Sequence, residues 1–423
     1  MNTLPKIDMI EATRLTREGR LEEAMAVLRG ALPDAPSSAA PSKFDGDARQ
    51  RPAGATPRIL DMVPPSMGTG DSWTSPQFGE TQTAGPLGGM SQPQIPEALR
   101  RFLDRMGQLR SARGLDGLVR PAAGRPQGPL PGGARFEERT YANEAGSRTY
   151  KLYVPSRYNG QALPLVVMLH GCTQSPDDFA AGTRMNDLAE EQTFLVAYPA
   201  QAQSANVSKC WNWFSAGDQQ RDQGEPSLIA GITRQIMHDF PVEPARVYIA
   251  GLSAGGAAAA IMASTYPDLY AAIGVHSGLA CGAASDISSA FAAMRQGGSP
   301  AVGRSRRHGG SVGAVPTIVF HGDRDTTVNP VNGDQVIAQS KAAADLRTTV
   351  SHGEALGGIK YTCTVQADES GRPMLEQWVL HGAGHAWSGG SAEGSYTEPH
   401  GPDASREMMR FFLQHPATAA SVC

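Results

Sequence analysis

The chain has 423 residues, 40% of them hydrophobic and 18% charged, so it can bury the core of one large domain or of two or three small ones. Its formal net charge is -4 at pH 7 and its isoelectric point is about 6.2, which argues against overall attraction to nucleic acid or to an anionic membrane. The five cysteines include no Cys-x-x-Cys pair, which argues against a structural zinc site and a disulfide framework but permits one isolated bridge.

The beginning of the chain, Met1 to Glu11, contains no apolar segment of signal-peptide length. No later run approaches the roughly 18 apolar residues of a membrane-spanning helix. We therefore expect no membrane span and a protein that starts in the cytoplasm.

The first third of the chain predicts a short helical element and a long linker. Apolar residues recur at helical spacing from Ile7 to Leu32, and Glu18 to Leu32 looks like half of a tetratricopeptide hairpin. Because one unit cannot build a repeat array, residues 1–32 are predicted to be a small docking or capping element, with a protein partner or a polymer granule as the docking target. A partner-binding repeat domain is the less favoured alternative. Residues 33–133 hold fifteen of the 31 prolines and predict a disordered linker with one amphipathic helix near 96–112.

Residues 134–416 predict one large folded domain, followed by a short tail at 417–423. Short apolar runs alternate with longer helical patterns there, which is typical of a mainly parallel sheet with helices on both faces, an α/β fold. The predicted strands are Tyr150–Val154, Leu165–Leu169, Phe194–Tyr198, Val247–Ala250, Thr317–Phe320 and Gln377–Leu380, and the predicted helices are Asp177–Glu191, Glu225–Phe240 and Ala254–Ala263.

One serine, Ser253, lies in the motif Gly251-Leu-Ser-Ala-Gly255, between a predicted strand and an alanine-rich helix. In a nucleophile elbow, such glycines let the strand and helix approach while the serine takes a strained backbone conformation. The motif alone is weak, because residues 309–313 also fit it but follow an Arg/His/Gly loop. The flanking strand and helix favour Ser253 as a nucleophile over a structural serine.

A serine nucleophile needs a base that takes its proton and a third group that orients the base. One predicted strand leads into a turn with Asp323 and Asp325; either can cap the turn, and its position after the preceding His-Gly favours Asp325 as the acid. A later strand leads into a glycine loop with His381 and His385, of which His385 is the better placed base and His381 can be a packed histidine. The order serine, aspartate, histidine is that of the α/β-hydrolases.

Acyl transfer also needs donors for the developing oxyanion. The early strand ending in His170-Gly171 is followed by Cys172, whose backbone N–H is one candidate donor. The N–H of Ala254, directly after the nucleophile, is the second. The alternative is that His170-Gly171 is an ordinary turn, and the functional interpretation is favoured over it.

Five motifs occur in a fixed order: His-Gly-Cys-Thr-Gln (170–174), Cys-Trp-Asn-Trp-Phe (210–214), Gly-Leu-Ser-Ala-Gly (251–255), His-Gly-Asp-Arg-Asp-x-x-Val (321–328), and Gly-His-Ala-Trp-Ser-Gly-Gly (384–390) followed by Gly-Ser-Tyr-Thr. Together they resemble the short-chain polyhydroxyalkanoate (PHB) depolymerase family of esterases, which is related to feruloyl and acetylxylan esterases. The resemblance covers about Phe136 to His415 and leaves the N-terminal third outside.

The resemblance implies an α/β-hydrolase fold with the triad Ser253, Asp325 and His385, and it assigns the oxyanion hole to the Cys172 and Ala254 N–H groups. It places Trp211 and Trp213 in the substrate cleft, whereas the residues alone leave core and cleft equally open for both. Trp387, two residues after the base, is a further candidate for the cleft.

The resemblance also suggests a bridge between Cys172 and Cys210. Such a bridge needs an oxidising compartment, and members of the family are often secreted, whereas no signal peptide is visible. Either the bridge is absent and the enzyme works inside the cell, or export uses another route.

The predicted function is a serine esterase without cofactor or metal that hydrolyses poly(3-hydroxybutyrate), another short-chain polyhydroxyalkanoate, or its oligomers through an acyl-enzyme. A feruloyl or acetylxylan esterase is the alternative within this chemistry. A granule- or partner-binding protein with an inactive hydrolase-like body is the alternative of another class. Residues 264–314 show no long apolar lid helix, which disfavours an interfacial lipase.

Overall fold

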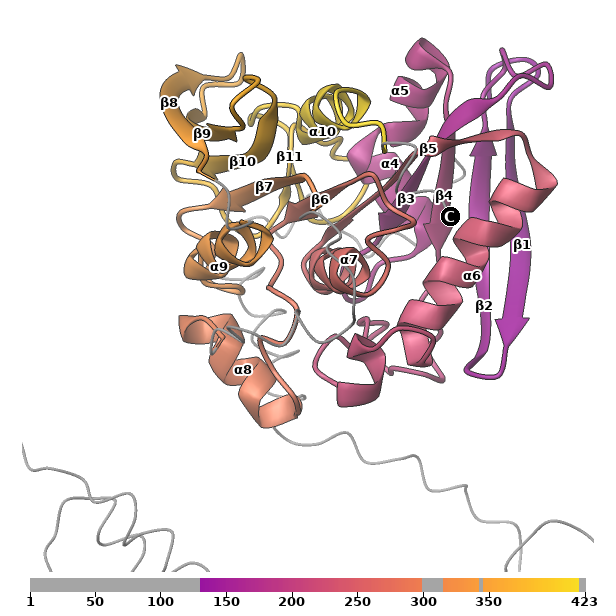
Figure 1. Ribbon diagram of the computed structural model, residues 1–423, viewed down its shortest axis with the longest axis horizontal. Helices are drawn as coiled ribbons and strands as arrows, with labels where there is room; N and C mark the ends of the chain where they lie inside the picture. The colour runs from indigo at the N-terminus through magenta and orange to yellow at the C-terminus, as the bar shows by residue number, and fades with distance from the viewer. Residues whose placement is uncertain (1–129, 299–314, 342–344, 418–423) are drawn as a thin grey trace, which may run out of the picture. The chain divides into compact units, whose positions relative to one another are not determined.

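A computed structural model describes residues 130–298, 315–341 and 345–417 (Figure 1). The predicted helical element at 1–32, the predicted helix near 96–112 and the second Gly-x-Ser-x-Gly match at 309–313 lie outside these residues. Within the described ranges, no helix has both the length and the apolar composition needed to cross a membrane.

A ten-stranded sheet forms the centre of the described domain, in the order β1-β2-β4-β3-β5-β6-β7-β10-β9-β8. The six strands from β4 to β10 in this order are parallel, and the strands at both edges pair antiparallel. The bounds are β1 (Arg135–Asn143), β2 (Gly146–Val154), β3 (Leu163–Leu169), β4 (Leu195–Pro199), β5 (Val242–Leu252), β6 (Ala272–His276), β7 (Thr317–Gly322), β8 (Arg347–Glu354), β9 (Lys360–Ala367) and β10 (Pro373–Leu380).

The central strands are mostly apolar because helices cover both of their faces. Every residue of β3, β4, β6 and β7 is buried, whereas the edge strand β8 is exposed at nearly every position. A strand that is buried on both faces needs a continuous apolar run, while an edge strand with a solvated face does not. The predicted mainly parallel sheet is therefore confirmed.

Two separate cores lie on the two faces of the sheet (Figure 1). One face is covered by α6 (Gly224–Asp239), α7 (Ala254–Thr265) and α9 (Val331–Ser340), and α8 (Ile287–Gln296) packs on α9. The other face is covered by α4 (Pro176–Thr183), α5 (Met185–Gln192) and α10 (Ala404–Leu413). The remaining elements are the 3-10 helix η1 (Ala216–Gln219) and the small strand pair β11 (Trp387–Ser388) and β12 (Thr397–Glu398).

The predicted single helix from Asp177 to Glu191 is wrong, because it is two helices. Arg184 has a left-handed backbone with φ 55°, which ends α4 and redirects the chain into α5. A left-handed residue breaks the hydrogen-bond ladder of a helix whatever the apolar spacing around it. The apolar spacing remains helical on both sides of Arg184, so the sequence pattern could not reveal the bend.

Candidate active site

Ser253 lies in the tight turn that joins β5 to α7. Its backbone has φ 58° and ψ -118°, a conformation that is strained for a residue with a side chain, and its N–H donates to the His276 carbonyl on β6 at 2.9 Å. Strain of this kind persists only where the surrounding structure enforces it, and it is concentrated at functional sites. The strand-to-helix turn therefore presents one serine at the carboxyl edge of the parallel strands.

The two glycines of the motif are required by close backbone contacts. A Cβ on Gly251 would lie 2.3 Å from the backbone of Gly255, and a Cβ on Gly255 would lie 2.0 Å from the Leu169 carbonyl oxygen. Real side chains do not approach backbone atoms this closely, so α7 could not remain against the ends of β3 and β5. The glycines thus fix where the helix begins and where Ser253 lies.

We expect Gly255→Ala to destabilise the domain by more than about 4 kcal/mol, because β3 must move to admit the new methyl group. Thermal denaturation of the purified variant, or its loss from the soluble fraction, measures this effect. Gly217→Ala is the matched control, since an added Cβ there meets nothing within 4 Å. A Gly255→Ala protein that melts within a few degrees of the wild type would show that the close approach is not needed.

His385 and Asp325 form a buried pair at the ends of two adjacent parallel strands. The Nδ1 of His385 lies 2.6 Å from the Oδ2 of Asp325, whose side chain is fully buried. The other carboxylate oxygen accepts the backbone N–H groups of Thr327 and Val328, both at 2.8 Å. Leu380 on β10 pairs in register with Gly322 on β7, so the two strands end at the same position along the sheet. The turns that follow them, which carry Asp325 and His385, therefore lie side by side.

The surroundings of Asp325 keep it ionised. Burial raises the pKa of its carboxyl, but the charge of His385 and the hydrogen bonds from His321 and His385 hold the pKa well below its ordinary range. An ionised carboxylate can only accept, so it takes the Nδ1–H of His385 and leaves Nε2 free to accept a proton. This is the tautomer that a general base next to a serine requires.

The rival residues form a second pair at the surface. The Nδ1 of His381 lies 3.0 Å from the Oδ2 of Asp323, and the Gly382 N–H donates to the other oxygen of Asp323 at 2.7 Å. Both side chains are about two-fifths exposed, and neither lines the cavity at Ser253. This pair ties the turns after β7 and β10 together. Across the described residues, no group of three His, Cys, Asp or Glu side chains could hold a metal ion.

One cavity brings together Ser253, His385 and the two predicted oxyanion donors, Cys172 and Ala254. Ala254 is the first residue of α7, and N–H groups in the first turn of a helix have no partner within that helix. Cys172 follows the end of β3, which pairs with β5 beside the elbow. Both backbone segments therefore reach the cavity from the carboxyl edge of the sheet.

A disulfide joins Cys172 to Cys210 and holds the loop that follows β4 against the end of β3. The Thr173 N–H also donates to the Ser208 carbonyl, at 2.7 Å. These two links fix the segment after β3 to the loop that carries Trp213 and Phe214 into the cavity.

Of the three tryptophans predicted for the cleft, only Trp213 lines the cavity. The prediction is wrong for Trp211 and Trp387, which are 0% and 1% exposed and belong to the cores on opposite faces of the sheet. Trp211 packs on His170, and Trp387 stacks on His276. Their indole N–H groups are satisfied by the His170 carbonyl and by the Ser405 hydroxyl. Large aromatic residues beside an active site can thus support it without reaching the substrate.

One apolar wall of the cavity was not predicted from the sequence. Helix α8 lines the cavity with Ile287, Ala290, Phe291 and Met294, which lie on one face of the helix. The available signal was the i, i+3, i+4, i+7 spacing of these residues after Asp286, which caps the helix. Leu279 and Val328 extend the wall, so the cavity is mostly apolar with a few polar groups near Ser253.

The fold and its serine elbow are those of the α/β-hydrolase class. A solved acetyl xylan esterase from Aspergillus awamori has the same fold, with a TM-score of 0.51, 20% sequence identity, and coverage of 66% of this chain and 99% of that one. Residues 148–352 match the family described as esterase PHB depolymerase. The match includes Ser253 and Asp325 and ends before His385.

Curated relatives show the same relationship. Poly(3-hydroxyalkanoate) depolymerase C of Paucimonas lemoignei is 34% identical over 239 residues, which are 55% of this chain and 57% of that protein. Acetylxylan esterase A of Talaromyces purpureogenus is 32% identical over 45% of this chain and 52% of its own length. Feruloyl esterase B of Thermothelomyces thermophilus is 27% identical over 55% of this chain and 82% of its own length. The chain thus spans little more than half of the first two relatives.

Proposed function

We propose that this protein is a serine esterase that works through an acyl-enzyme. The observation that carries the proposal is the 2.6 Å contact between His385 and Asp325, at a cavity that His385 shares with the strained Ser253. A serine, an oriented histidine and a buried carboxylate at the carboxyl edge of an α/β sheet are the components of acyl transfer.

In the proposed mechanism, Nε2 of His385 takes the proton of Ser253 as its Oγ attacks the ester carbonyl. The oxygen of the tetrahedral intermediate becomes negative and accepts hydrogen bonds from the Cys172 and Ala254 N–H groups. His385 then gives its proton to the leaving alcohol. A water molecule, activated by the same histidine, releases the acyl group and restores Ser253. Asp325 remains ionised throughout and stabilises the imidazolium. No cofactor is needed.

We propose as substrates the ester bonds of poly(3-hydroxybutyrate), another short-chain polyhydroxyalkanoate, or their oligomers. The family match and the 34% identity to a poly(3-hydroxyalkanoate) depolymerase support this choice. The cavity wall built by α8, Leu279 and Val328 is aliphatic and aromatic, which suits a short acyl unit with an alkyl side chain.

A feruloyl or acetylxylan esterase is the second candidate, supported by the identities of 27% and 32% to enzymes of those names. The catalytic steps would be the same. Release of 3-hydroxybutyrate from amorphous polymer and from oligomers, compared with release of ferulate or acetate from model esters, separates the candidates. Ser253→Ala should abolish whichever activity is present. Ser253-dependent release of ferulate or acetate alone would overturn the depolymerase assignment and leave the mechanism.

For residues 1–32 we propose docking to a polymer granule or a protein partner. The support is their helical apolar spacing and the proline-rich segment that follows it. A chain that begins at Gly133 should keep its hydrolysis of small soluble esters and lose binding to the polymer or partner. Equal polymer binding by the truncated and full chains would contradict the docking role. Absence of Ser253-dependent hydrolysis with polymer binding intact would instead support a purely binding protein.

A further inference from the structure

A buried carboxylate outside the cavity holds the loop that forms one of the cavity walls. We propose that Glu225 is a positioning residue for the Cys172 oxyanion donor and that it acts through the loop 205–214. This inference rests on the proposed serine esterase mechanism. Glu225 itself does not line the cavity, so its role is indirect.

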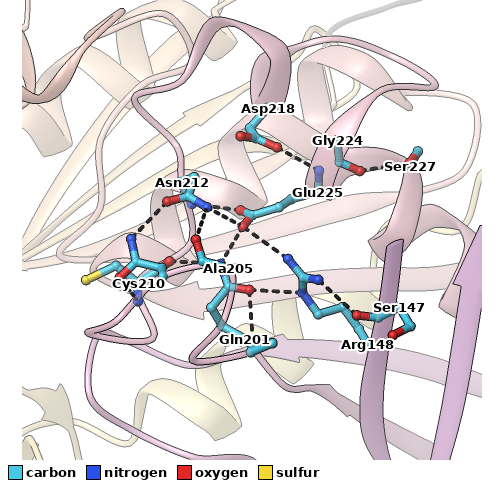
Figure 2. Close-up of polar contacts among 12 residues, drawn as sticks. Ser147, Arg148, Gln201, Ala205, Cys210, Asn212, Asp218, Gly224, Glu225 and Ser227 are labelled. Carbon is cyan, nitrogen blue, oxygen red and sulfur yellow. Dashed lines mark hydrogen bonds and ion pairs between the residues drawn. The ribbon is translucent and has the colours of Figure 1, made fainter. Parts of the chain in front are cut away.

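Figure 2 shows Glu225 reaching from the first turn of α6 to the loop. Its Oε2 accepts the Asn212 backbone N–H at 2.7 Å, and its Oε1 accepts the Asn212 side-chain amide at 2.9 Å. Oε1 also accepts the side-chain amide of Gln201 and lies 3.5 Å from the Arg148 guanidinium. The carboxylate is 6% exposed, so these contacts replace nearly all of its solvation.

Asn212 transmits this anchoring along the loop. Its side-chain oxygen accepts the side-chain amide of Asn206 at 2.9 Å, and the oxygen of Asn206 accepts the Ser208 and Cys210 N–H groups. The Gln201 amide that contacts Glu225 also donates to the Cys210 carbonyl at 2.9 Å. The carboxylate thus fixes Cys210 from two directions.

The loop in turn fixes the oxyanion segment through three links. Cys210 is bonded to Cys172, Ser208 accepts the Thr173 N–H, and Trp211 donates to the His170 carbonyl at 3.1 Å. Since the loop is attached on both sides of Cys172, a shift of the loop must move the Cys172 N–H. An oxyanion donor is effective only when it is aimed in advance at the developing charge.

The network requires Glu225 in its ionised form. The carboxylate contacts four groups, and all of them are N–H donors: the Asn212 backbone N–H, the Asn212 side-chain amide, the Gln201 amide and the Arg148 guanidinium. A proton on the carboxyl would therefore face a donor and break one of these contacts. Burial raises the pKa of Glu225 to about 7; Asp218 from η1 also raises it, and Arg148 from β2 lowers it.

A raised carboxyl pKa favours folding at low pH, and that contribution is lost as pH rises through about 7. The ionised carboxylate is therefore held at a cost in stability, which fits a positioning role better than a stabilising one.

The test is Glu225→Gln, assayed with 4-nitrophenyl acetate at pH 8 and normalised by active-site titration with an organophosphonate. We expect kcat to fall about 10- to 100-fold with little change in KM, because a small ester barely contacts the loop and loses transition-state stabilisation only. The matched control is Glu190→Gln, since Glu190 also accepts three hydrogen bonds, from Tyr153 and Ser156, but lies away from the cavity. Its kcat should stay within about twofold of the wild type.

The pH profile distinguishes positioning from a structural role. In the wild type, protonation of Glu225 should make kcat fall more steeply below about pH 7 than in Glu225→Gln, because the variant has no ionisable group at this position. The acid slope of the variant should therefore be shallower. A normalised kcat and an acid slope that both match the wild type would overturn the proposal, whatever the loss of thermal stability.

A second variant covers the case in which Glu225→Gln does not fold. Asn212→Ala removes the side-chain hydrogen bonds to Glu225, Asn206 and Ala205 and keeps the backbone N–H that contacts Glu225. We expect kcat to fall at least about threefold to tenfold, which is the effect of losing one hydrogen bond or more. An unchanged kcat in this variant would also overturn the proposal. Failure of the proposed function is separate, because the wild type would then show no Ser253-dependent hydrolysis at all.

Discussion

Ser253→Ala should lower kcat by about 10⁶-fold on any ester that the wild type hydrolyses, because no other group can form the acyl-enzyme. The side chain is only 9% exposed and alanine is smaller, so the elbow can keep its geometry and the domain its fold. The measurements are kcat with a chromogenic ester and covalent labelling with a fluorescent organophosphonate, which should be lost together. Circular dichroism and the melting temperature verify the fold.

Ser277→Ala is the matched control for this substitution. Ser277 follows β6, next to β5 in the sheet; it also has a left-handed backbone, with φ 49°, and it is fully buried. It does not line the cavity, so its variant should keep kcat within about tenfold of the wild type and should still be labelled. If Ser253→Ala were still labelled and Ser277→Ala were not, the nucleophile would be Ser277 and the assignment of Ser253 would be wrong.

Asp325→Asn should lower kcat by about 10⁴-fold while the protein stays folded. An asparagine oxygen can still accept the Thr327 and Val328 N–H groups, but its amide would face His385 and select the wrong tautomer of the imidazole. The measurement is kcat of the purified variant at pH 8. Asp323→Asn, at the exposed pair with His381, should lower kcat by less than about tenfold. If Asp323→Asn caused the larger loss, the acid would be Asp323.

The same aspartate predicts a pH dependence of stability. Because the pKa of Asp325 is held well below its ordinary range in the folded protein, its ionised form stabilises the fold above about pH 4, and this contribution is lost as pH falls towards the folded pKa. The wild type should therefore exceed Asp325→Asn in free energy of unfolding at pH 7, and the difference should shrink at pH 3. Urea denaturation at both pH values measures it. A difference that grows on acidification would contradict the direction of the pKa shift.

The class of fold and the place of the proposed nucleophile could be predicted from the sequence. Continuous apolar runs such as Leu165–Leu169 predict strands buried on both faces, and the glycines around Ser253 predict a strand and a helix in close contact. Both features can be predicted from short stretches of chain, because the apolar run of a buried strand and the glycines of a tight turn are local in the sequence. The family resemblance came from the same local motifs and is confirmed by the match over residues 148–352.

Which of these residues contact one another depends on the packing of separate elements and could not be predicted from the sequence. Two aspartates and two histidines have similar local sequence, and the alignment of β7 with β10 pairs Asp325 with His385 inside and Asp323 with His381 at the surface. Trp211 and Trp387 lie in the cores and Trp213 in the cavity because packing against other elements, not the identity of the residue, sets exposure. The contacts that join Glu225 to the loop at Asn212 likewise connect separate elements, and no periodicity within either segment encodes them.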